Sequence, residues 1–130
     1  MKKELEQKLY KKYPKIFVQR KLDMSKTSMC FGLQCGDGWY DLIDKVCGYL
    51  QFQIDNNGMP QFSFNTVKEK FGSLRLYTDG WNSELDNVIS FAEYLSQFIC
   101  EECGQPGKIG GQILILCRCD KCRKAMRKEI

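Results

Sequence analysis

The stretch QFSFNTVKEKFGSLRLYT, residues 61–78, decides the fold. Apolar and polar side chains alternate through residues 61–68 and again through residues 73–78, which is the two-residue period of a β-strand. The segment Glu69–Gly72 between the two runs ends in a glycine and turns the chain. The stretch therefore predicts two antiparallel strands joined as a β-hairpin.

Amphipathic helices are predicted before and after this hairpin. Apolar residues recur at helical spacing through residues 39–53, behind Asp37, which is well placed to cap that helix. Residues 83–99 show the same pattern, and Ser83 with Asp86 resembles a capping box. Both apolar stripes need a common partner, and the hairpin offers a sheet surface. We therefore expect an α+β fold in which a small antiparallel sheet is covered on one face by two or three amphipathic helices.

The N-terminal region predicts a short helix and no export signal. Leu5, Leu9 and Tyr10 lie at helical spacing within residues 2–12, and Pro14 ends the pattern. The basic start is followed by charged residues and not by an apolar block, so we expect no secretory signal and a cytoplasmic protein. No apolar run approaches the roughly eighteen residues of a membrane helix.

The C-terminal region contains cysteines at metal-ligand spacing. Of the eight cysteines in the chain, four form two pairs, each with two residues between its members. This spacing lets one tight turn aim both sulfur atoms at a single ion, and a reducing compartment favours metal binding over disulfides. The fifteen residues between the pairs suffice for a hairpin through residues 110–111. The sequence predicts a structural Zn²⁺ bound by Cys100, Cys103, Cys119 and Cys122.

Cys117 offers a third thiol beside the second pair. We assign it to the strand before the pair, because Cys119 and Cys122 have the required spacing, and its replacement of Cys119 as a ligand is the open alternative. Catalysis by a cysteine is disfavoured, because the chain contains no histidine to activate it. The other cysteines are interpreted as buried or partly buried small apolar residues of the body: Cys30, Cys35 and Cys47.

Length and charge bound the architecture and the function. A chain of 130 residues that is 43% hydrophobic and 28% charged is one domain of ordinary size, so we expect a body of residues 1–99 with a zinc ribbon of residues 100–130 packed on it. Residues 1–26 hold nine Lys and Arg against three Asp and Glu, whereas residues 27–100 hold four against nine. The acidic middle weakens the case for a general polyanion binder, although the net charge is +4.

Two segments, residues 36–41 and 67–77, carry more chemistry than packing requires. Lys68 and Lys70 have the same parity along a strand, and Arg75 follows across the turn. Beside a glycine-rich helix start, such cations suit an anion or a stacked base, whereas the alternative is a hairpin with solvated charges. We expect one exposed groove lined by Asp37, Trp39, Lys68, Lys70 and Arg75.

The same two segments carry a resemblance to a known family. The motifs GDGWYDLI from Gly36, EKFGSLRLY from Glu69 and the paired cysteines after Ile99 are similar to those of small accessory proteins encoded in tailed-phage and prophage genomes. The likeness covers about Tyr13 to Cys122. It implies a phage protein that acts in the host cytoplasm, and it places the terminal ligands at the same four cysteines. Cys117 is an addition to the family pattern.

These observations rank three functional hypotheses. The first is a non-enzymatic binding protein that sequesters a host protein or a small anionic signal, as a counter-defence inhibitor would. The second is a nucleic-acid-binding accessory protein, with basic ends and exposed aromatic residues as its contacts. The least favoured is a small enzyme that uses Asp37 or Glu69 as an acid or base, with Lys70 or Arg75 holding an anionic substrate.

Overall fold

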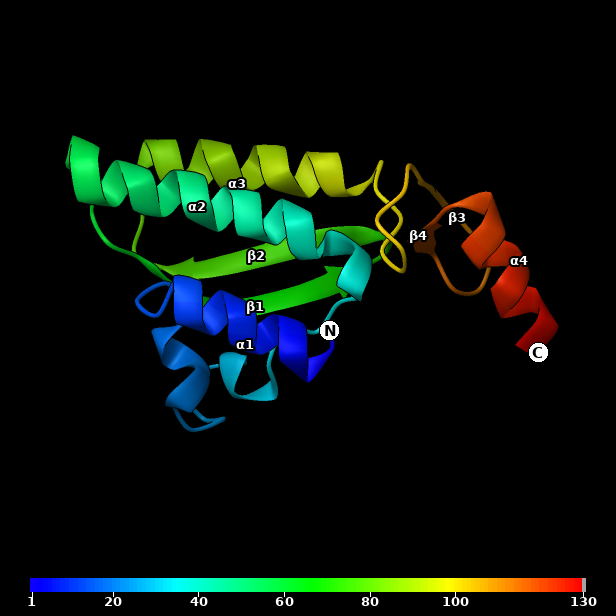
Figure 1. Ribbon diagram of the computed structural model, residues 1–130, viewed down its shortest axis with the longest axis horizontal. Helices are drawn as coiled ribbons and strands as arrows, with labels where there is room; N and C mark the ends of the chain where they lie inside the picture. The colour runs from blue at the N-terminus through cyan, green and yellow to red at the C-terminus, as the bar shows by residue number, and fades with distance from the viewer. Residues whose placement is uncertain (130) are drawn as a thin grey trace.

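The structure is a computed structural model, and it describes residues 1–129 (Figure 1). Its fold is α+β, with a two-stranded antiparallel sheet in the body and a smaller two-stranded sheet near the C-terminus. Among the described helices, none has both the length and the apolar character that a membrane-spanning helix needs. The elements are α1 (Lys3–Lys12), α2 (Tyr40–Asn57), β1 (Ser63–Lys70), β2 (Ser73–Asp79), α3 (Ser83–Ser96), β3 (Lys108–Gly110), β4 (Leu116–Arg118) and α4 (Asp120–Glu129).

The predicted hairpin is present, and its turn is tighter than expected. β1 pairs with β2 up to Lys70 and Ser73, so only Phe71 and Gly72 form the turn. Both have positive φ, 52° and 87°, as a two-residue hairpin turn of type I′ requires. The Glu69 carboxylate accepts a hydrogen bond from the Gly72 amide at 2.8 Å and supports this turn. Glycine takes such a conformation freely, whereas phenylalanine is strained in it.

The position of α3 differs from our expectation. Two outward backbone amides of β2 are bound by side chains of α3: Leu74 N donates to Ser96 Oγ at 2.9 Å, and Leu76 N donates to Glu93 Oε2 at 3.0 Å. The helix therefore borders the edge of the sheet, whereas we expected it to cover the face. The physical reason is that the outer edge of a two-stranded sheet leaves amides that need partners.

The other edge of the sheet is also occupied. Phe64 N donates to Ile16 O at 2.9 Å, and Glu69 N donates to Gln34 O at 3.0 Å. Gln34 N in turn donates to Val67 O at 2.9 Å, so the segment before α2 runs beside β1 as a short third strand would. Segments without regular secondary structure thus protect the hairpin edge from water.

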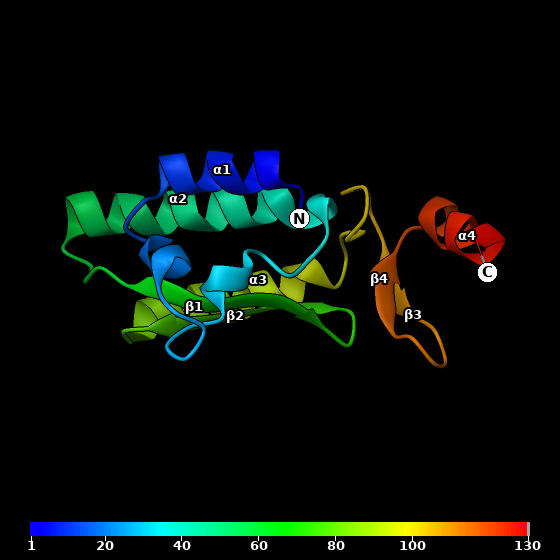
Figure 2. The same ribbon diagram turned by 90° about the horizontal axis from the view of Figure 1, so that it is seen from below.

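The core lies between the inner face of the hairpin and the pair α1 and α2. Figure 2 shows α1 and α2 on one side of the hairpin, with α3 at the level of the strands. The side chains that fill this space are fully or almost fully buried, and the largest among them are Trp39, Phe17, Phe64, Leu9, Ile16 and Ile43. No described helix covers the opposite face of the hairpin. The candidate binding surface lies on that face.

A buried carboxylate joins α1 to α2. Asp44 accepts hydrogen bonds from Tyr13 Oη at 2.7 Å and from Lys12 Nζ at 3.2 Å. Burial alone would raise the pKa of Asp44, but the hydrogen bonds from Tyr13 and Lys12 outweigh it, so the pKa lies below its ordinary value of 3.8. The ionised form is therefore the one that holds the two helices together.

We predict that Asp44→Asn lowers the free energy of unfolding by about 1 to 2 kcal/mol at pH 7. Because the folded pKa of Asp44 is depressed, its contribution is present above the unfolded value and is lost as pH falls through the folded value. Urea unfolding at pH 7 and pH 3 should show the deficit of the variant shrinking at the lower pH. Asp55→Asn, at an exposed position of α2, is the control, and a deficit independent of pH would contradict the assignment.

Candidate metal centre and binding surfaces

Four cysteines come together at one point, as their spacing predicted. The sulfur atoms of Cys100, Cys103, Cys119 and Cys122 all lie within 4.8 Å of one another, and those of Cys103 and Cys119 are 3.7 Å apart. Cys100 is buried and Cys103 is exposed, so the cluster lies at the surface with one ligand anchored inside. Among the described residues, this set is the one whose geometry suits a metal ion.

Each half of the cluster is built by local structure. Cys100 follows α3 and its loop, while Cys122 lies in the first turn of α4, and the β3–β4 hairpin returns the chain between them (Figure 1). Cys122 N donates to Cys119 Sγ at 3.4 Å, the amide-to-sulfur contact that a two-residue spacing allows. Burial disfavours the Cys100 thiolate, but backbone hydrogen bonds from Cys119 and Cys103 outweigh it and lower the pKa of Cys100 to about 7. Cys100 is therefore the member of the cluster whose thiolate, the form that binds metal, is favoured, whereas burial and the neighbouring cysteines raise the pKa of Cys122 to about 12.

Cys117 lies outside the cluster, as we assigned it. It is fully buried in β4, and its thiol contacts the backbone oxygens of Ser96, Gln97 and Ile99 at 3.1 to 3.4 Å. These carbonyl groups belong to the end of α3 and the loop after it, where a helix leaves acceptors without partners. Cys117 thus caps α3 and fixes β4 against it.

The GDGW motif is where the cysteine region docks on the body. Gly36 N donates to Glu101 Oε2 at 2.8 Å, and Gly38 N donates to the Glu101 carbonyl at 2.7 Å. A Cβ atom on Gly38 would lie 2.6 Å from Glu101 O and from Gly104 N. Glycine is required here because the backbone of the first cysteine pair passes too close for any side chain.

Glu101 holds the cysteine region on the body, a structural role that our sequence reasoning missed. Its side chain is almost fully buried, and its other carboxylate oxygen lies 3.0 Å from Arg118 Nη1. One carboxylate therefore ties Gly36 of the body to Arg118 of β4. The only sequence signal was an acidic residue beside Cys100 and a basic one beside Cys117, and such neighbours are common at solvated positions.

Trp39 and Asp37 do not line an exposed groove, and this part of our prediction is wrong. Trp39 is 0% exposed, and its Nε1 donates to the Ile99 carbonyl at 2.9 Å, so the ring packs in the core beneath the cysteine region. Asp37 accepts a hydrogen bond from Lys2 N at 2.8 Å, where its charge favours the N-terminus of α1. We expected these glycines to leave room for a ligand. The space beside them is filled by the protein's own backbone.

Lys68, Lys70 and Arg75 do come together, on the outer face of the hairpin. Lys68 is the cross-strand partner of Arg75, and Lys70 lies two residues further along β1 on the same face. None of the ion pairs among the side chains of residues 1–126 involves any of the three. Tyr77 lies on this face too, with its ring centroid 5.8 Å from Lys68 Nζ, and Phe71 at the turn is 67% exposed. We call these five residues the hairpin face.

The groups proposed for catalysis are separated in the structure. Glu69 pairs with Leu74 on the inner face of the hairpin, opposite Lys70 and Arg75, and its carboxylate supports the turn. Burial raises the pKa of Cys35 to about 12, which disfavours a thiolate nucleophile at neutral pH. Cys47 is buried as well, whereas Cys30 is exposed, so our expectation of a buried or partly buried side chain is wrong for Cys30.

Comparisons with protein-family models, with curated proteins and with solved structures found no match. The site is therefore interpreted from its own geometry.

We predict that Cys119→Ser loses the bound metal and that Cys117→Ser keeps it. The Cys119 sulfur belongs to the cluster, whereas the Cys117 sulfur contacts only carbonyl oxygens at the end of α3. Metal content of the purified variants, measured by mass spectrometry of the element, decides between them. Loss of metal from the Cys117 variant alone would reverse the ligand assignment.

We predict that Gly38→Ala destabilises the protein by about 1 to 3 kcal/mol, because the added carbon meets backbone atoms that have no freedom to move aside. Denaturant unfolding of the metal-loaded chain measures the loss. Gly48→Ala in α2 is the matched control, since its nearest neighbour would be the Tyr13 hydroxyl at 3.2 Å. Equal stability of the two variants would show that the close approach is not required.

Proposed function

We propose that this chain is a non-enzymatic, zinc-stabilised binding protein that holds an extended anionic partner, a single-stranded nucleic acid, on its hairpin face. The observation that carries the proposal is the gathering of Lys68, Lys70 and Arg75 on one strand face with no acidic partner among the described residues. Like charges placed opposite each other repel, so their juxtaposition suits a ligand that neutralises them.

Zinc is the metal that the four thiolates favour. Zinc bonds to thiolate sulfur at about 2.3 Å, which separates the corners of a tetrahedron by about 3.8 Å, and the Cys103 and Cys119 sulfurs lie 3.7 Å apart. Four thiolates complete the coordination shell and leave no position for water or substrate. The metal therefore supports folding of the C-terminal region and its docking onto Gly36 and Gly38.

Charge segregation supports an anionic partner at the hairpin despite the acidic middle of the chain. Three of the four cations in residues 27–100 lie on the hairpin face, whereas six of the nine carboxylates belong to α2 and α3. A count of charges over residues 27–100 adds these two surfaces together and so conceals their separation. In this part of the chain most cations are therefore presented on strands and most carboxylates on helices.

The exposed aromatic residues favour nucleic acid among anionic partners. Tyr77 is 43% exposed and Phe71 is 67% exposed, and both are next to cations of the same face. Bases stack on such rings while Lys and Arg contact the phosphates. Phe71 is held in a strained left-handed conformation at the turn, a cost that is typical of functional positions.

An open strand face also follows an extended chain better than it encloses a small anion. Successive residues on one face of a strand are about 6.8 Å apart, so Lys68 and Lys70 mark out a track along β1. The resemblance to phage accessory proteins motivates a partner from the host, and a counter-defence role is part of this proposal. Sequestration of a host protein or a small anionic signal is the alternative occupant of the same surface.

We predict that Lys70→Ala with Arg75→Ala weakens binding of a fluorescein-labelled 20-nucleotide single-stranded RNA at least tenfold. Loss of two phosphate contacts should also reduce the slope of log affinity against log salt by about 1.4. Fluorescence anisotropy across a salt series measures both quantities. Melting temperature should change little, because solvated charges contribute no more than about 0.5 kcal/mol.

The control is Lys8→Ala with Lys11→Ala, which removes the same charge from exposed positions of α1. It should leave affinity within about twofold of the unchanged protein. If both double variants weaken RNA binding equally, the interaction depends on net charge and not on the hairpin face. Absence of RNA binding at low salt, with retention of polyglutamate or inorganic pyrophosphate, would move the proposal to an acidic protein or a small anion.

A further inference from the structure

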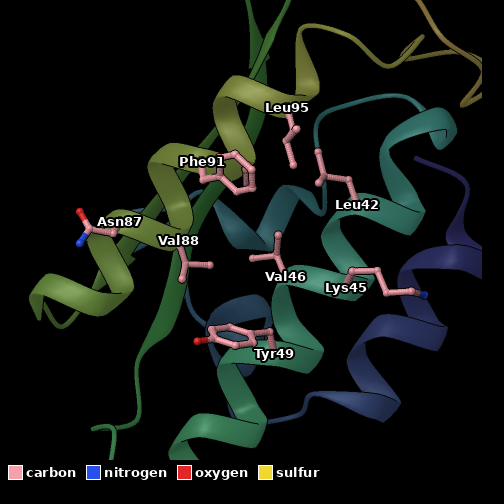
Figure 3. A pocket seen from close by; sticks show the side chains of 9 residues that line it. Leu42, Lys45, Val46, Tyr49, Asn87, Val88, Phe91 and Leu95 are labelled. Carbon is pink, nitrogen blue, oxygen red and sulfur yellow. The ribbon is translucent and has the colours of Figure 1, made fainter.

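Two of the hollows in this protein have the same volume, about 440 Å³, and differ in their lining. Figure 3 shows the first, between α2 and α3, where Val46, Val88 and Phe91 line the space and Lys45 extends away from it. Apolar walls of this kind do not distinguish one occupant from another. The second lies between α1 and the segment of residues 20–32, and its walls carry charged and hydroxyl groups beside apolar ones. We call it the N-terminal pocket.

Two cations from different elements line the N-terminal pocket. Lys3 begins α1, and Arg20 belongs to the short 3₁₀ helix Val18–Lys21. Neither forms an ion pair with a carboxylate among the side chains of residues 1–126. Arg20 is held in place, because its Nη1 donates to the Phe17 carbonyl at 3.0 Å and its guanidinium lies 5.0 Å from the centroid of the Tyr10 ring. A guanidinium has five N–H donors, so an anion can bind to the rest of the group.

Tyr10 adds a neutral donor to the same pocket. Burial, together with the nearby Glu6 carboxylate, raises the pKa of Tyr10 to about 12, so its hydroxyl keeps the proton at neutral pH. The lining thus offers three donor groups, two of them charged: Lys3, Arg20 and Tyr10. A phosphate monoester presents three terminal oxygens and nearly two negative charges, whereas a carboxylate has two oxygens and one charge. The donor set therefore suits a phosphate better than a carboxylate.

Glu6 is the carboxylate among the described lining residues, and its position is fixed. Glu6 Oε2 accepts a hydrogen bond from the Leu33 amide at 2.7 Å. A Cβ atom on Gly32 would lie 3.0 Å from Glu6 Cδ, so glycine is what lets the carboxylate approach this closely. The bond to Leu33 uses one oxygen, and the other can accept from a hydroxyl or an amino group. A ligand for this pocket therefore carries hydrogen-bond donors as well as an anionic group.

An exposed aromatic ring completes the lining. Phe31 is 58% exposed, whereas its neighbour Met29 is fully buried and adds an apolar wall. Both belong to the 3₁₀ helix Met29–Phe31. An exposed phenylalanine presents a ring on which a planar group can stack. The volume of the pocket lies within the range of about 300 to 1,000 Å³ that is typical of small-molecule sites.

We propose that the N-terminal pocket binds a nucleoside monophosphate. Lys3, Arg20 and Tyr10 bind its phosphate group. Phe31 stacks on its base, and Glu6 accepts a hydrogen bond from its ribose or base. A nucleotide combines the anionic group, the planar ring and the donors that this lining requires together. The site is separate from the hairpin face, which belongs to β1, β2 and their turn.

Isothermal titration calorimetry of the full-length chain with the four ribonucleoside 5′-monophosphates tests this proposal. At least one of them should bind about tenfold or more tightly than its nucleoside, which lacks the phosphate, and than inorganic phosphate, which lacks the ring. Arg20→Gln should weaken that nucleotide by about tenfold or more. Lys21→Gln is the matched control, because it removes the neighbouring exposed cation of the same 3₁₀ helix, and its affinity should stay within about twofold.

Cys30 reports where the nucleotide binds. It lines the pocket and is exposed, so N-ethylmaleimide can alkylate it. Bound nucleotide should slow this alkylation, as measured by mass spectrometry of the peptide that contains Cys30. Lys3→Gln, at an exposed position, is the second variant if Arg20→Gln lowers the melting temperature, and it should also weaken the nucleotide by about tenfold.

The remaining outcomes would overturn the proposal. They are the absence of binding by all four nucleotides, equal binding of a nucleotide and its nucleoside, equal binding of inorganic phosphate, and unchanged alkylation of Cys30. Equal effects of Arg20→Gln and Lys21→Gln would attribute binding to net charge. The variant with Lys70→Ala and Arg75→Ala should bind the nucleotide within about twofold of the unchanged protein. Loss of binding in that variant would place the nucleotide on the hairpin face instead.

Discussion

The contact between Glu101 and the glycines of the GDGW motif is the constraint on which the rest of the structure depends. Through its carboxylate, its carbonyl and its amide, Glu101 is bound to Gly36, Gly38 and Cys117 at once. It lies between Cys100 and Cys103 of the cysteine cluster, so a metal ion held there would fix its backbone against the body. The ion pair with Arg118 satisfies the second carboxylate oxygen, which would otherwise be a buried charge without a partner.

This contact extends to both ends of the body. Trp39, next to Gly38, binds the Ile99 carbonyl and so fixes the loop that follows α3. Ile109 of β3 lies within 3.1 to 3.4 Å of the position that a Cβ on Gly72 would take, so the cysteine region also touches the hairpin turn. The cysteine region therefore contacts both the end of α3 and the turn of the hairpin. The hairpin face belongs to an element that it touches.

Periodicity predicted the elements of this fold better than it predicted their placement. The alternation in residues 61–78 and the apolar stripe in residues 83–99 reflect burial, which is a local signal. The edge position of α3 depends on Ser96 and Glu93 finding two amides of β2, and no spacing in the sequence encodes a contact between distant polar groups. The cysteine cluster was predictable because a tetrahedral metal imposes its own spacing on the chain.

The residues of the candidate binding site were also predictable only in part. Strand parity placed Lys68, Lys70 and Arg75 on one face, since a hairpin register follows from its turn. The burial of Trp39 could not be predicted in this way, because the glycines beside it leave room either for a ligand or for a neighbouring backbone segment. Only the close approach of Glu101 to Gly38 distinguishes the two cases.

The separation of charge is also the strongest physical argument for binding over catalysis. An active site needs an acid or base and a substrate-holding cation to converge within a few ångströms of one reacting atom. Here Lys68, Lys70 and Arg75 lie on the outer face of the hairpin, while Glu69 lies on its inner face and six of the nine carboxylates in residues 27–100 lie on α2 and α3. The distance between these groups is the physical reason for proposing a binding protein and not an enzyme.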